Sequence, residues 1–401
     1  MPFQLARHVS PRTRVAGRPM LSRHRCRSNQ CTQTGTLAAT LAEGNSHRKE
    51  DSRILRCNES EGKLTISLVT GAAGFIGSRL IVELLREGHQ VIAALRNAAT
   101  KKEKLLGFIA TQGLTDPSIS FVEYDLSHDF KLDSLLTDAQ KKIHVVYHLA
   151  ASFNWGISKA EAQRTNVKSG LALIEWAATL KQLERFIWIG GYRVATPPQE
   201  SADDLYYKYG GYEASKILGH QAFIETCKRL NVPWTAINPA TVIDGFYTYG
   251  DMQYIGIAEM IGKLYQGRLM ALPGGRDTFL PLCNMQYIVS FLIRTMFYPE
   301  TIAQEYMLLD PATPKFHRLV HLAAEHLGVS SPHLQIPKVL LEKLPEVLLD
   351  GSKEQLSFIS TEHYHVAGAE AMAAKMGMAR AAWAWFQAIT SARVFTGASL
   401  W

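Results

Sequence analysis

The sequence predicts an α/β fold with a doubly wound parallel sheet. From about residue 63 onward, short apolar and β-branched segments alternate with segments of helical periodicity. A cluster of glycines follows the first apolar segment directly and precedes a helical pattern. Apolar residues make up 47% of the chain, which is enough for a sizeable core.

The first unit is a strand, a glycine loop, a helix and a second strand. Residues 64–70 form an apolar, β-branched run that is typical of a buried parallel strand. Residues 78–86 carry apolar side chains at helical spacing, and Gly88 ends that helix. Residues 89–95 then predict the second strand.

The same alternation continues through the middle of the chain. Four more strands are predicted at residues 120–124, 144–149, 185–189 and 233–237, with the clearest helices at 166–180 and 212–230. Ligands of such sheets bind beyond the carboxyl ends of the strands. We therefore expect the functional site at that edge.

The glycine loop has the features of a phosphate-binding turn. Gly71 permits a tight turn out of the strand, Gly74 lets the backbone approach a pyrophosphate, and Gly77 lets the helix pack closely on the sheet. Together with Phe75 and Ile76, they bring free N–H groups and the positive helix end to the phosphates. We therefore expect this loop to bind a dinucleotide cofactor.

The end of the second strand predicts which dinucleotide binds. An acidic side chain there would hydrogen-bond the ribose 2′-hydroxyl of NAD(H), but this chain has Arg96, which can pair with a 2′-phosphate. The sequence therefore favours NADP(H), with NAD(H) as the alternative.

Four segments, in their order and spacing, resemble the motifs of the extended short-chain dehydrogenase/reductases. The segment from Thr70 to Gly77 is similar to the TGxxGxxG loop of that family, and Tyr212 with Lys216 matches its YxxxK motif. The resemblance implies further cofactor contacts at Asp125 and Leu126 for the adenine, Leu149, Ala150 and Ala151 beside the ribose, Lys216, and Pro239 after the sixth strand.

The resemblance extends from about residue 63 to the end of the chain and implies a Rossmann-type fold. It divides the chain into a disordered basic extension at 1–62, an NAD(P)-binding domain at 63–245 and a substrate-binding lobe at 246–401 that is interleaved with the sheet. It also implies that the protein is an NAD(P)-dependent oxidoreductase.

The YxxxK spacing is chemically meaningful because residues four apart share one face of a helix. Lys216 then lies beside Tyr212, and a neighbouring ammonium lowers the pKa of a phenol from its ordinary value of about 10. Tyr212 can therefore exchange a proton with the substrate oxygen while hydride moves to or from the nicotinamide.

The chain departs from the family after the fifth strand. The family usually has a Ser or Thr there to hydrogen-bond the substrate carbonyl, whereas this chain has Gly190 and Gly191, of which Gly191 is the better match. Loss of one such donor can cost about 10²–10³ in rate. A water, Ser152 or the substrate itself could replace it, or the protein could bind a cofactor without fast turnover.

Two segments bear on the substrate. Asn238 and Pro239 follow the sixth strand, where sugar-nucleotide epimerases of the family typically have Arg-Pro and reductases often have Asn-Pro. Residues 256–273 and the chain after Pro311 resemble the substrate lobe of the thioester-reductase and acyl-reductase branch. Near the C-terminus, Met and aromatic residues fall at roughly helical spacing and favour core packing, with an apolar wall of the substrate site as the alternative: Met372, Met376, Met378, Trp383, Trp385 and Phe386.

Three functions follow from these observations. The first is an NADP(H)-dependent reductase of a carbonyl or acyl thioester on an apolar substrate. The second is a nucleotide-sugar epimerase or dehydratase. The third is a weakly active or non-catalytic dinucleotide-binding sensor, which Gly191 motivates. The pair of Tyr212 and Lys216 argues against the third function, and Asn238 argues against the second.

The charge of the chain is concentrated at its N-terminus. Residues 1–42 hold seven of the 43 Lys and Arg residues and no Asp or Glu, so the rest of the chain is formally neutral. We therefore expect no nucleic-acid partner. The basic extension is a transit peptide into an organelle matrix, a flexible tail or an upstream extension of the true start.

The remaining composition predicts a cytoplasmic protein in a reducing compartment. No apolar run is long enough for a membrane span, since the best candidate, residues 287–298, is short and contains Arg294. The five cysteines have neither a disulfide-framework spacing nor a zinc spacing, so we expect no metal. The resemblance also implies a homodimer through helices 166–180 and 212–230.

Overall fold

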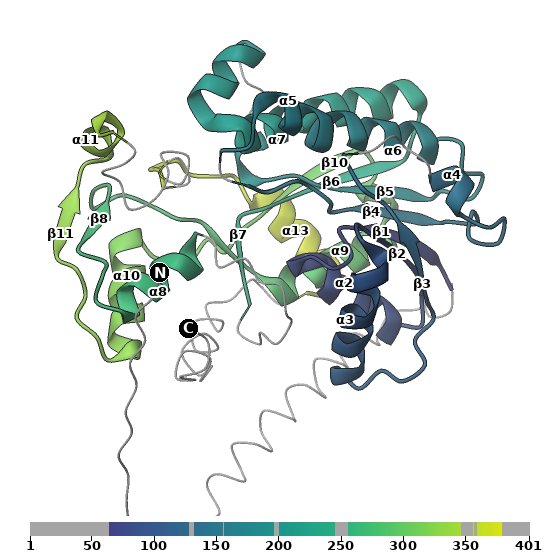
Figure 1. Cartoon of the computed structure of the whole chain (residues 1–401), viewed down its shortest axis with the longest axis horizontal. Helices are drawn as coiled ribbons and strands as arrows, with labels where there is room; N and C mark the ends of the chain where they lie inside the picture. The colour runs from purple at the N-terminus through teal and green to yellow at the C-terminus, as the bar shows by residue number, and fades with distance from the viewer. Residues whose placement is uncertain are drawn as a thin grey trace, which may run out of the picture. The chain divides into compact units, whose positions relative to one another are not determined.

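The central sheet of the described chain has seven parallel strands in the order β10-β6-β5-β4-β1-β2-β3 (Figure 1). The computed structural model describes residues 64–127, 132–154, 156–195, 200–244, 256–345, 356 and 359–378. Contacts divide the chain into Met1–Gly62 and Lys63–Trp401, and the fold described is that of the second unit.

The strands are short and mostly buried, as expected for a parallel sheet covered on both faces. Their bounds are β1 Ile66–Thr70, β2 Gln90–Leu95, β3 Ile119–Glu123, β4 Val145–His148, β5 Arg185–Ile189, β6 Trp234–Pro239 and β10 Gln304–Leu308. The strand order reverses between β1 and β4, and this switch point is where doubly wound sheets bind ligands.

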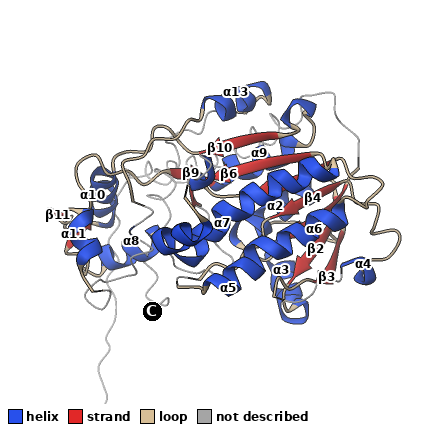
Figure 2. Ribbon diagram, turned by 90° about the horizontal axis from the view of Figure 1, so that it is seen from above, coloured by secondary structure: helices blue, strands red, loops and turns tan. Residues whose placement is uncertain are grey.

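Two layers of helices cover the sheet (Figures 1 and 2). One layer has α2 Phe75–Arg86, α3 Ala98–Thr111, α9 Met285–Thr295 and α13 Ala367–Lys375. The other has α4 Leu132–Leu135, α5 Lys159–Ala162, the π-helix η1 Gln163–Lys168, α6 Ser169–Ala177 and α7 Ala202–Leu230. Apolar side chains from each layer and from alternate strand positions form one core cluster per face.

A smaller lobe with its own core follows the sheet domain. It contains α8 Ile257–Tyr265, β8 Ala271–Pro273, α10 Phe316–Leu327, β11 Leu334–Ile336 and α11 Lys338–Lys343. β8 and β11 pair in parallel. A second parallel pair, β7 Thr241–Ile243 with β9 Leu282–Asn284, continues from the end of β6. The short 3-10 helices are η2 Tyr192–Ala195 and η3 Pro299–Thr301.

The predicted α/β class is confirmed, and all six predicted strands lie within two residues of their expected bounds. The seventh strand, β10, was not predicted. Two predicted helices differ in detail: the one at 166–180 begins inside a π-helix and ends at Ala177, and the one at 212–230 begins at Ala202 and kinks at Gly210.

The C-terminal Met pattern also packs as expected where the structure describes it. Met372 and Met376 are buried in the core, and Met378 packs against it. Trp383, Trp385 and Phe386 lie outside the described residues, as does the predicted basic extension. Among the described helices, none is both long enough and apolar enough to cross a membrane.

Candidate active site

The glycine loop joins β1 to α2 in a geometry that side chains would disrupt. Gly71 has a φ of +69°, and a Cβ there would lie 2.9 Å from the backbone nitrogen of Ala150. The Gly74 N–H donates to the Gly71 carbonyl at 2.9 Å, and a Cβ on Gly77 would lie 2.2 Å from that oxygen. The first residues of α2, Phe75 and Ile76, follow Gly74, which provides no side-chain cap. The first N–H groups of the helix therefore suit an anion.

The end of β4 lies directly beside this loop. The Leu149 N–H donates to the Thr70 carbonyl, and the Ala150 N–H donates to Thr70 Oγ1, both at 3.3 Å. Thr70 Oγ1 also lies 2.8 Å from His148 Nδ1. Burial, followed by the charge of Lys216, lowers the pKa of His148 to about 3, so this imidazole is neutral at pH 7. The predicted ribose-binding segment is thus fixed against the phosphate loop.

The end of β2 places Arg96 in solvent beside a carboxylate. Asn97 adopts a left-handed conformation with a φ of +59°, and α3 begins after it. The two oxygens of Glu123, at the end of β3, accept the N–H groups of Asn97 and Ala98 at 2.7 Å each. This carboxylate therefore occupies the N-terminus of α3, close to where Arg96 would meet a 2′-phosphate.

The remaining predicted cofactor residues also follow strand ends. Asp125 Oδ1 accepts both the N–H and the O–H of Ser127, at 2.9 and 2.7 Å, so this carboxylate shapes the turn after β3. Leu126 packs against one core cluster, and Pro239 is the buried last residue of β6. Parallel strands end at one edge of a sheet, so the predicted residues share that edge.

Two glycines set the position of Tyr212. Gly210 has a φ of +78° and a ψ of 179°, and it separates the two helical segments of α7. A Cβ on the next residue, Gly211, would lie 2.0 Å from the carbonyl oxygen of Ile157. Tyr212 therefore lies in the first turn of the second helical segment, with Lys216 one turn later on the same face.

The surroundings of Lys216 tune its charge. Its Nζ donates to the carbonyl of Ile189, the last residue of β5, at 2.8 Å. Burial lowers the pKa of Lys216 to about 8, while the Glu213 carboxylate opposes this shift. The half-buried ring of Tyr212 meets the Phe153 ring edge-on at a centroid distance of 4.4 Å. A phenol and a readily deprotonated ammonium thus share one face of α7.

The two glycines after β5 have different environments. A Cβ on Gly190 would lie 2.0 Å from Asn238 Oδ1 and 3.4 Å from His220 Nδ1, so this position is filled by its neighbours. Gly191 has no atom within 4 Å of the position that a Cβ would take. The position that corresponds to the usual Ser or Thr of the family is therefore open space.

Asn166 was missed by the sequence analysis. It lies in η1 and is buried, its Oδ1 accepts the Ser152 N–H at 2.7 Å, and its Nδ2 donates to the Ser152 carbonyl at 3.1 Å and to Ser215 Oγ at 3.0 Å. Asn166 thus ties the loop after β4 to the helix of Tyr212. A π-helix often marks a functional site, but its i→i+5 bonding has no sequence signal.

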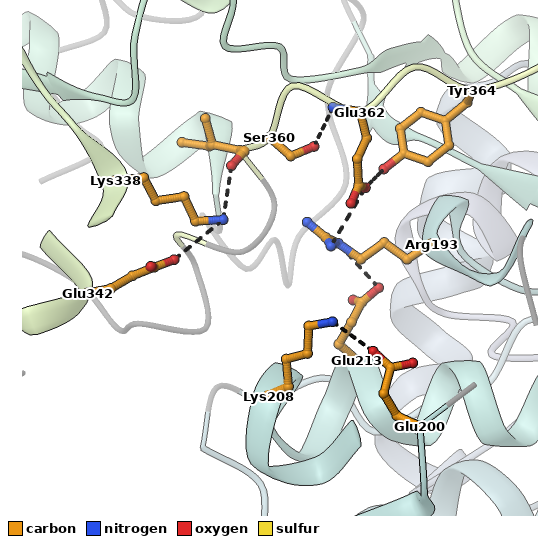
Figure 3. A network of polar contacts seen from close by, with 10 residues as sticks. Arg193, Glu200, Lys208, Glu213, Lys338, Glu342, Ser360, Glu362 and Tyr364 are labelled. Carbon is orange, nitrogen blue, oxygen red and sulfur yellow. Dashed lines mark hydrogen bonds and ion pairs between the residues drawn. The ribbon is translucent and has the colours of Figure 1, made fainter. Parts of the chain in front are cut away.

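A buried ion pair beside Tyr212 was also not predicted. Arg193 of η2 points at Glu213, and Glu362 of the C-terminal segment lies on the other side of the guanidinium (Figure 3). Glu213 occupies a variable position of the YxxxK segment, and Arg193 and Glu362 lie outside the family motifs that the sequence displays. Within the described residues, no group of three or more His, Cys, Asp or Glu side chains could hold a metal ion.

Comparison with known proteins gives the family. The pattern of the NAD dependent epimerase/dehydratase family matches residues 67–282. The chain belongs to this family. The match covers the glycine loop, the sheet as far as β6 and the motif of Tyr212, so the resemblance to the extended short-chain dehydrogenase/reductases is confirmed.

The relatives in this family include reductases and epimerases. The chain is 26% identical to a dihydroflavonol 4-reductase of Solanum lycopersicum over 203 residues, which are 47% of this chain and 52% of the relative. The chain thus spans about half the length of such a relative. It is 34% identical to a UDP-glucose 4-epimerase of Klebsiella pneumoniae over 110 residues, 27% of this chain and 76% of the relative.

A solved structure shows the same fold. The terminal R domain from the myxalamid PKS-NRPS biosynthetic pathway aligns with a TM-score of 0.57 and 20% identity, over 74% of this chain and 78% of the R domain. At this identity the likeness concerns the fold, which extends into the smaller lobe.

Proposed function

We propose that this protein is an NADP(H)-dependent reductase of a carbonyl or acyl thioester on an apolar substrate. Tyr212 is the catalytic acid and Lys216 adjusts its acidity. The observation that carries the proposal is the placement of both side chains on one face of α7 at the carboxyl edge of the sheet. There Lys216 Nζ is bonded to the end of β5.

The glycine loop supports binding of the cofactor. A Cβ at Gly71 or Gly77 would lie within 3.0 Å of backbone atoms, and the start of α2 directs its N–H groups toward an anion. Phe75, Ile76, Leu149, Ala150 and Ala151 would border the nucleotide, with Asp125, Leu126 and Pro239 at further strand ends. Bound NADPH supplies the hydride in this reaction.

The protein side of the reaction is a proton transfer. The phenolic O–H of Tyr212 donates its proton to the substrate oxygen as the carbonyl carbon accepts hydride, which leaves a phenolate and, from an aldehyde or ketone, an alcohol. From an acyl thioester the same step gives a hemithioacetal, whose C–S bond then breaks to release an aldehyde and a thiol. The Lys216 ammonium stabilises that phenolate. Asn166 holds the Ser152 loop against this helix, and a water, Ser152 or the substrate itself takes the place of the hydroxyl that Gly191 lacks.

The preference for NADP(H) rests on Arg96. Its guanidinium is exposed at the end of β2 and can pair with a 2′-phosphate. Glu123 works against this preference because it places a negative charge at the start of α3. NAD(H) is the alternative cofactor, and the two are separated by measuring kcat/KM for each.

Two features favour reduction over the alternatives. Asn238 is fixed beneath Gly190 where sugar-nucleotide epimerases of the family typically have arginine. A dihydroflavonol 4-reductase is also among the similar proteins. The 34% identity to a UDP-glucose 4-epimerase favours a nucleotide-sugar epimerase as the second candidate. A binding protein with little activity is the third candidate.

The test is NADPH oxidation with apolar aldehydes, ketones and acyl thioesters by the wild type and two Tyr variants. Tyr212→Phe removes the acid, and we expect it to lower kcat by about 10²–10⁴ with NADPH binding intact. Tyr207→Phe is the matched control, because Tyr207 lies on the same helix and is 93% exposed.

Other outcomes would overturn the proposal. Conversion of UDP-glucose without net change in NAD(H) would favour the epimerase. Tight NADPH binding without turnover of any substrate would favour the sensor.

We also propose a homodimer through α6 and α7 in the cytoplasm, or in an organelle matrix if residues 1–42 are a transit peptide. The domain bounds 1–62, 63–245 and 246–401 remain a proposal as well. Light scattering at micromolar concentration tests the dimer, and a monomeric mass would contradict it.

A further inference from the structure

Arg193 is the centre of a buried polar network beside the proposed site (Figure 3). Its side chain is only 7% exposed although it is charged. The Nε atom lies 3.7 Å from Glu213 Oε1, and the Nη1 atom lies 4.0 Å from Glu362 Oε2. The guanidinium therefore joins α7 to a segment that lies about 150 residues further along the chain.

The segment on the far side of Arg193 is residues 360–364. Ser360 forms an antiparallel bridge with Phe279 of the chain before β9, and the Tyr364 hydroxyl donates to Glu362 Oε2 at 2.7 Å. The Tyr364 ring meets the Tyr192 ring edge-on at a centroid distance of 5.3 Å. Glu362 itself is 56% exposed, so Arg193 and Tyr364 hold it at the rim of the site.

On its near side, Arg193 reaches the reacting groups through Glu213. This carboxylate is 4% exposed, follows Tyr212 directly and precedes Lys216 by three residues on α7. A buried carboxylate needs a partner, since its transfer from water is costly. Arg193 supplies the opposite charge, and Glu213 in turn favours the ammonium form of Lys216.

We propose that Arg193 is a positioning residue of the reductase site: it docks residues 360–364 against the helix of Tyr212 as a wall of the substrate site, and it offsets the charge of Glu213 beside Lys216. This inference rests on the proposed function. Because residues 360–364 belong to the C-terminal half of the chain, the substrate site is completed by this segment together with the sheet domain that carries Tyr212.

The charged and titratable groups around this link determine the sign of the effect. Lys216 faces Tyr212 and Glu213 on its own helix and the neutral His148 on β4, besides the Ile189 carbonyl. The groups around Arg193 are Tyr192, Tyr209, Glu213, Lys338, Glu362 and Tyr364. Loss of Arg193 removes one positive charge that offsets Glu213, so Glu213 favours the Lys216 ammonium more strongly and the pKa of Lys216 rises. Loss of the Glu213 charge lowers it.

The two halves of one ion pair should therefore shift the pH profile in opposite directions. Carbonyl reduction needs the Lys216 ammonium, so kcat/KM at saturating NADPH falls as pH rises through the pKa of that group. We call this fall of kcat/KM at high pH the basic limb of the profile. Relative to the wild type, we expect Arg193→Met to shift the basic limb to higher pH by about 0.5–1 pH unit, and Glu213→Gln to shift it to lower pH by a similar amount. Arg193→Met should also raise KM for bulky substrates.

A second readout does not depend on turnover. Hydrogen exchange of the amides of residues 360–364 reports whether the segment is docked. We expect about tenfold faster exchange in Arg193→Met and in Glu362→Gln, while Glu362→Gln leaves the basic limb in place. Lys208→Met is the matched control: it breaks the exposed pair with Glu200 drawn in Figure 3 and should change neither readout.

The outcomes separate this inference from the proposed function. If the wild type reduces no substrate, the proposed function fails, and hydrogen exchange alone still tests the docking role. If Arg193→Met does not fold, the double variant Arg193→Met/Glu213→Gln removes both buried charges and is measured in its place. The inference would be overturned if Arg193→Met and Glu213→Gln shifted the basic limb in the same direction. It would also be overturned if hydrogen exchange of residues 360–364 were unchanged in both Arg193→Met and Glu362→Gln.

Discussion

A serine at position 191 should increase reductase activity. Gly191 occupies the position where the family usually places a hydroxyl, and a Cβ there meets no atom within 4 Å. Its φ lies outside the left-handed region, so a serine adds no backbone strain. One hydrogen-bond donor to the substrate oxygen contributes about 10²–10³ in kcat at most. We expect Gly191→Ser to raise kcat tenfold or more, which is about 1.4 kcal/mol of barrier or more.

The neighbouring glycine is the matched control. A Cβ at Gly190 would lie 2.0 Å from Oδ1 of Asn238, a residue that is only 2% exposed. Gly190→Ser should therefore cost about 1–3 kcal/mol of stability through overpacking. Gly191→Ser should change stability by about 0.5 kcal/mol or less.

The assay is NADPH oxidation with the best aldehyde or thioester of the panel, together with urea unfolding of the wild type and both serine variants. An unchanged or lower kcat in Gly191→Ser, with stability preserved, would refute the reasoning. The substrate oxygen would then not approach position 191, and Ser152 or a water would remain as the donor.

Three further predictions concern cofactor choice and stability. Arg96→Ala should raise KM for NADPH about tenfold and leave KM for NADH unchanged. Glu123→Gln should lower KM for NADPH and leave KM for NADH unchanged. Steady-state kinetics with both cofactors check these two expectations. Burial, followed by the charge of Lys216, lowers the pKa of His148 from about 6.5 in the unfolded chain to about 3 in the folded one, so the unfolded chain binds more protons between these values and stability falls as pH falls. Replacing His148 by Gln should therefore reduce the pH dependence of the unfolding free energy in this range by up to about 1.4 kcal/mol per pH unit. Urea unfolding at several pH values measures this dependence. Arg79→Met should cost about 3–5 kcal/mol because it removes the guanidinium that pairs with the mostly buried Asp244 carboxylate, and Arg79→Met/Asp244→Asn should recover most of this loss.

The sequence predicts the fold well where local patterns coincide with tertiary roles. The strands β1, β2, β4 and β5 are continuous apolar runs because helices cover both faces of the sheet. β10 was not predicted because it is an edge strand whose first two residues, Gln304 and Glu305, are polar and exposed, so it lacks the continuous apolar run of a buried strand. Its strand character comes from pairing with β6, which lies about 70 residues earlier.

The site is predictable only where spacing encodes the chemistry. The loop glycines and the pair of Tyr212 and Lys216 follow local rules, so a motif is enough to find them. Asn166 and Arg193 act through partners 14 to 169 residues away, and such pairings leave no local pattern. Glu123 is similar, since its role depends on how β3 ends beside α3.

The two glycines after β5 show why a missing motif residue needs a structure to interpret. In the sequence, Gly190 and Gly191 are equivalent: both lack the hydroxyl that the family usually places after the fifth strand. In the structure a Cβ at Gly190 would lie 2.0 Å from Asn238 Oδ1 of β6, so a side chain there requires Asn238 to move. Gly191 has no such packing reason, so its lack of a side chain leaves open space after β5. A larger or differently placed substrate group can use that room, which connects the departure from the family motif to substrate choice rather than to the stability of the fold.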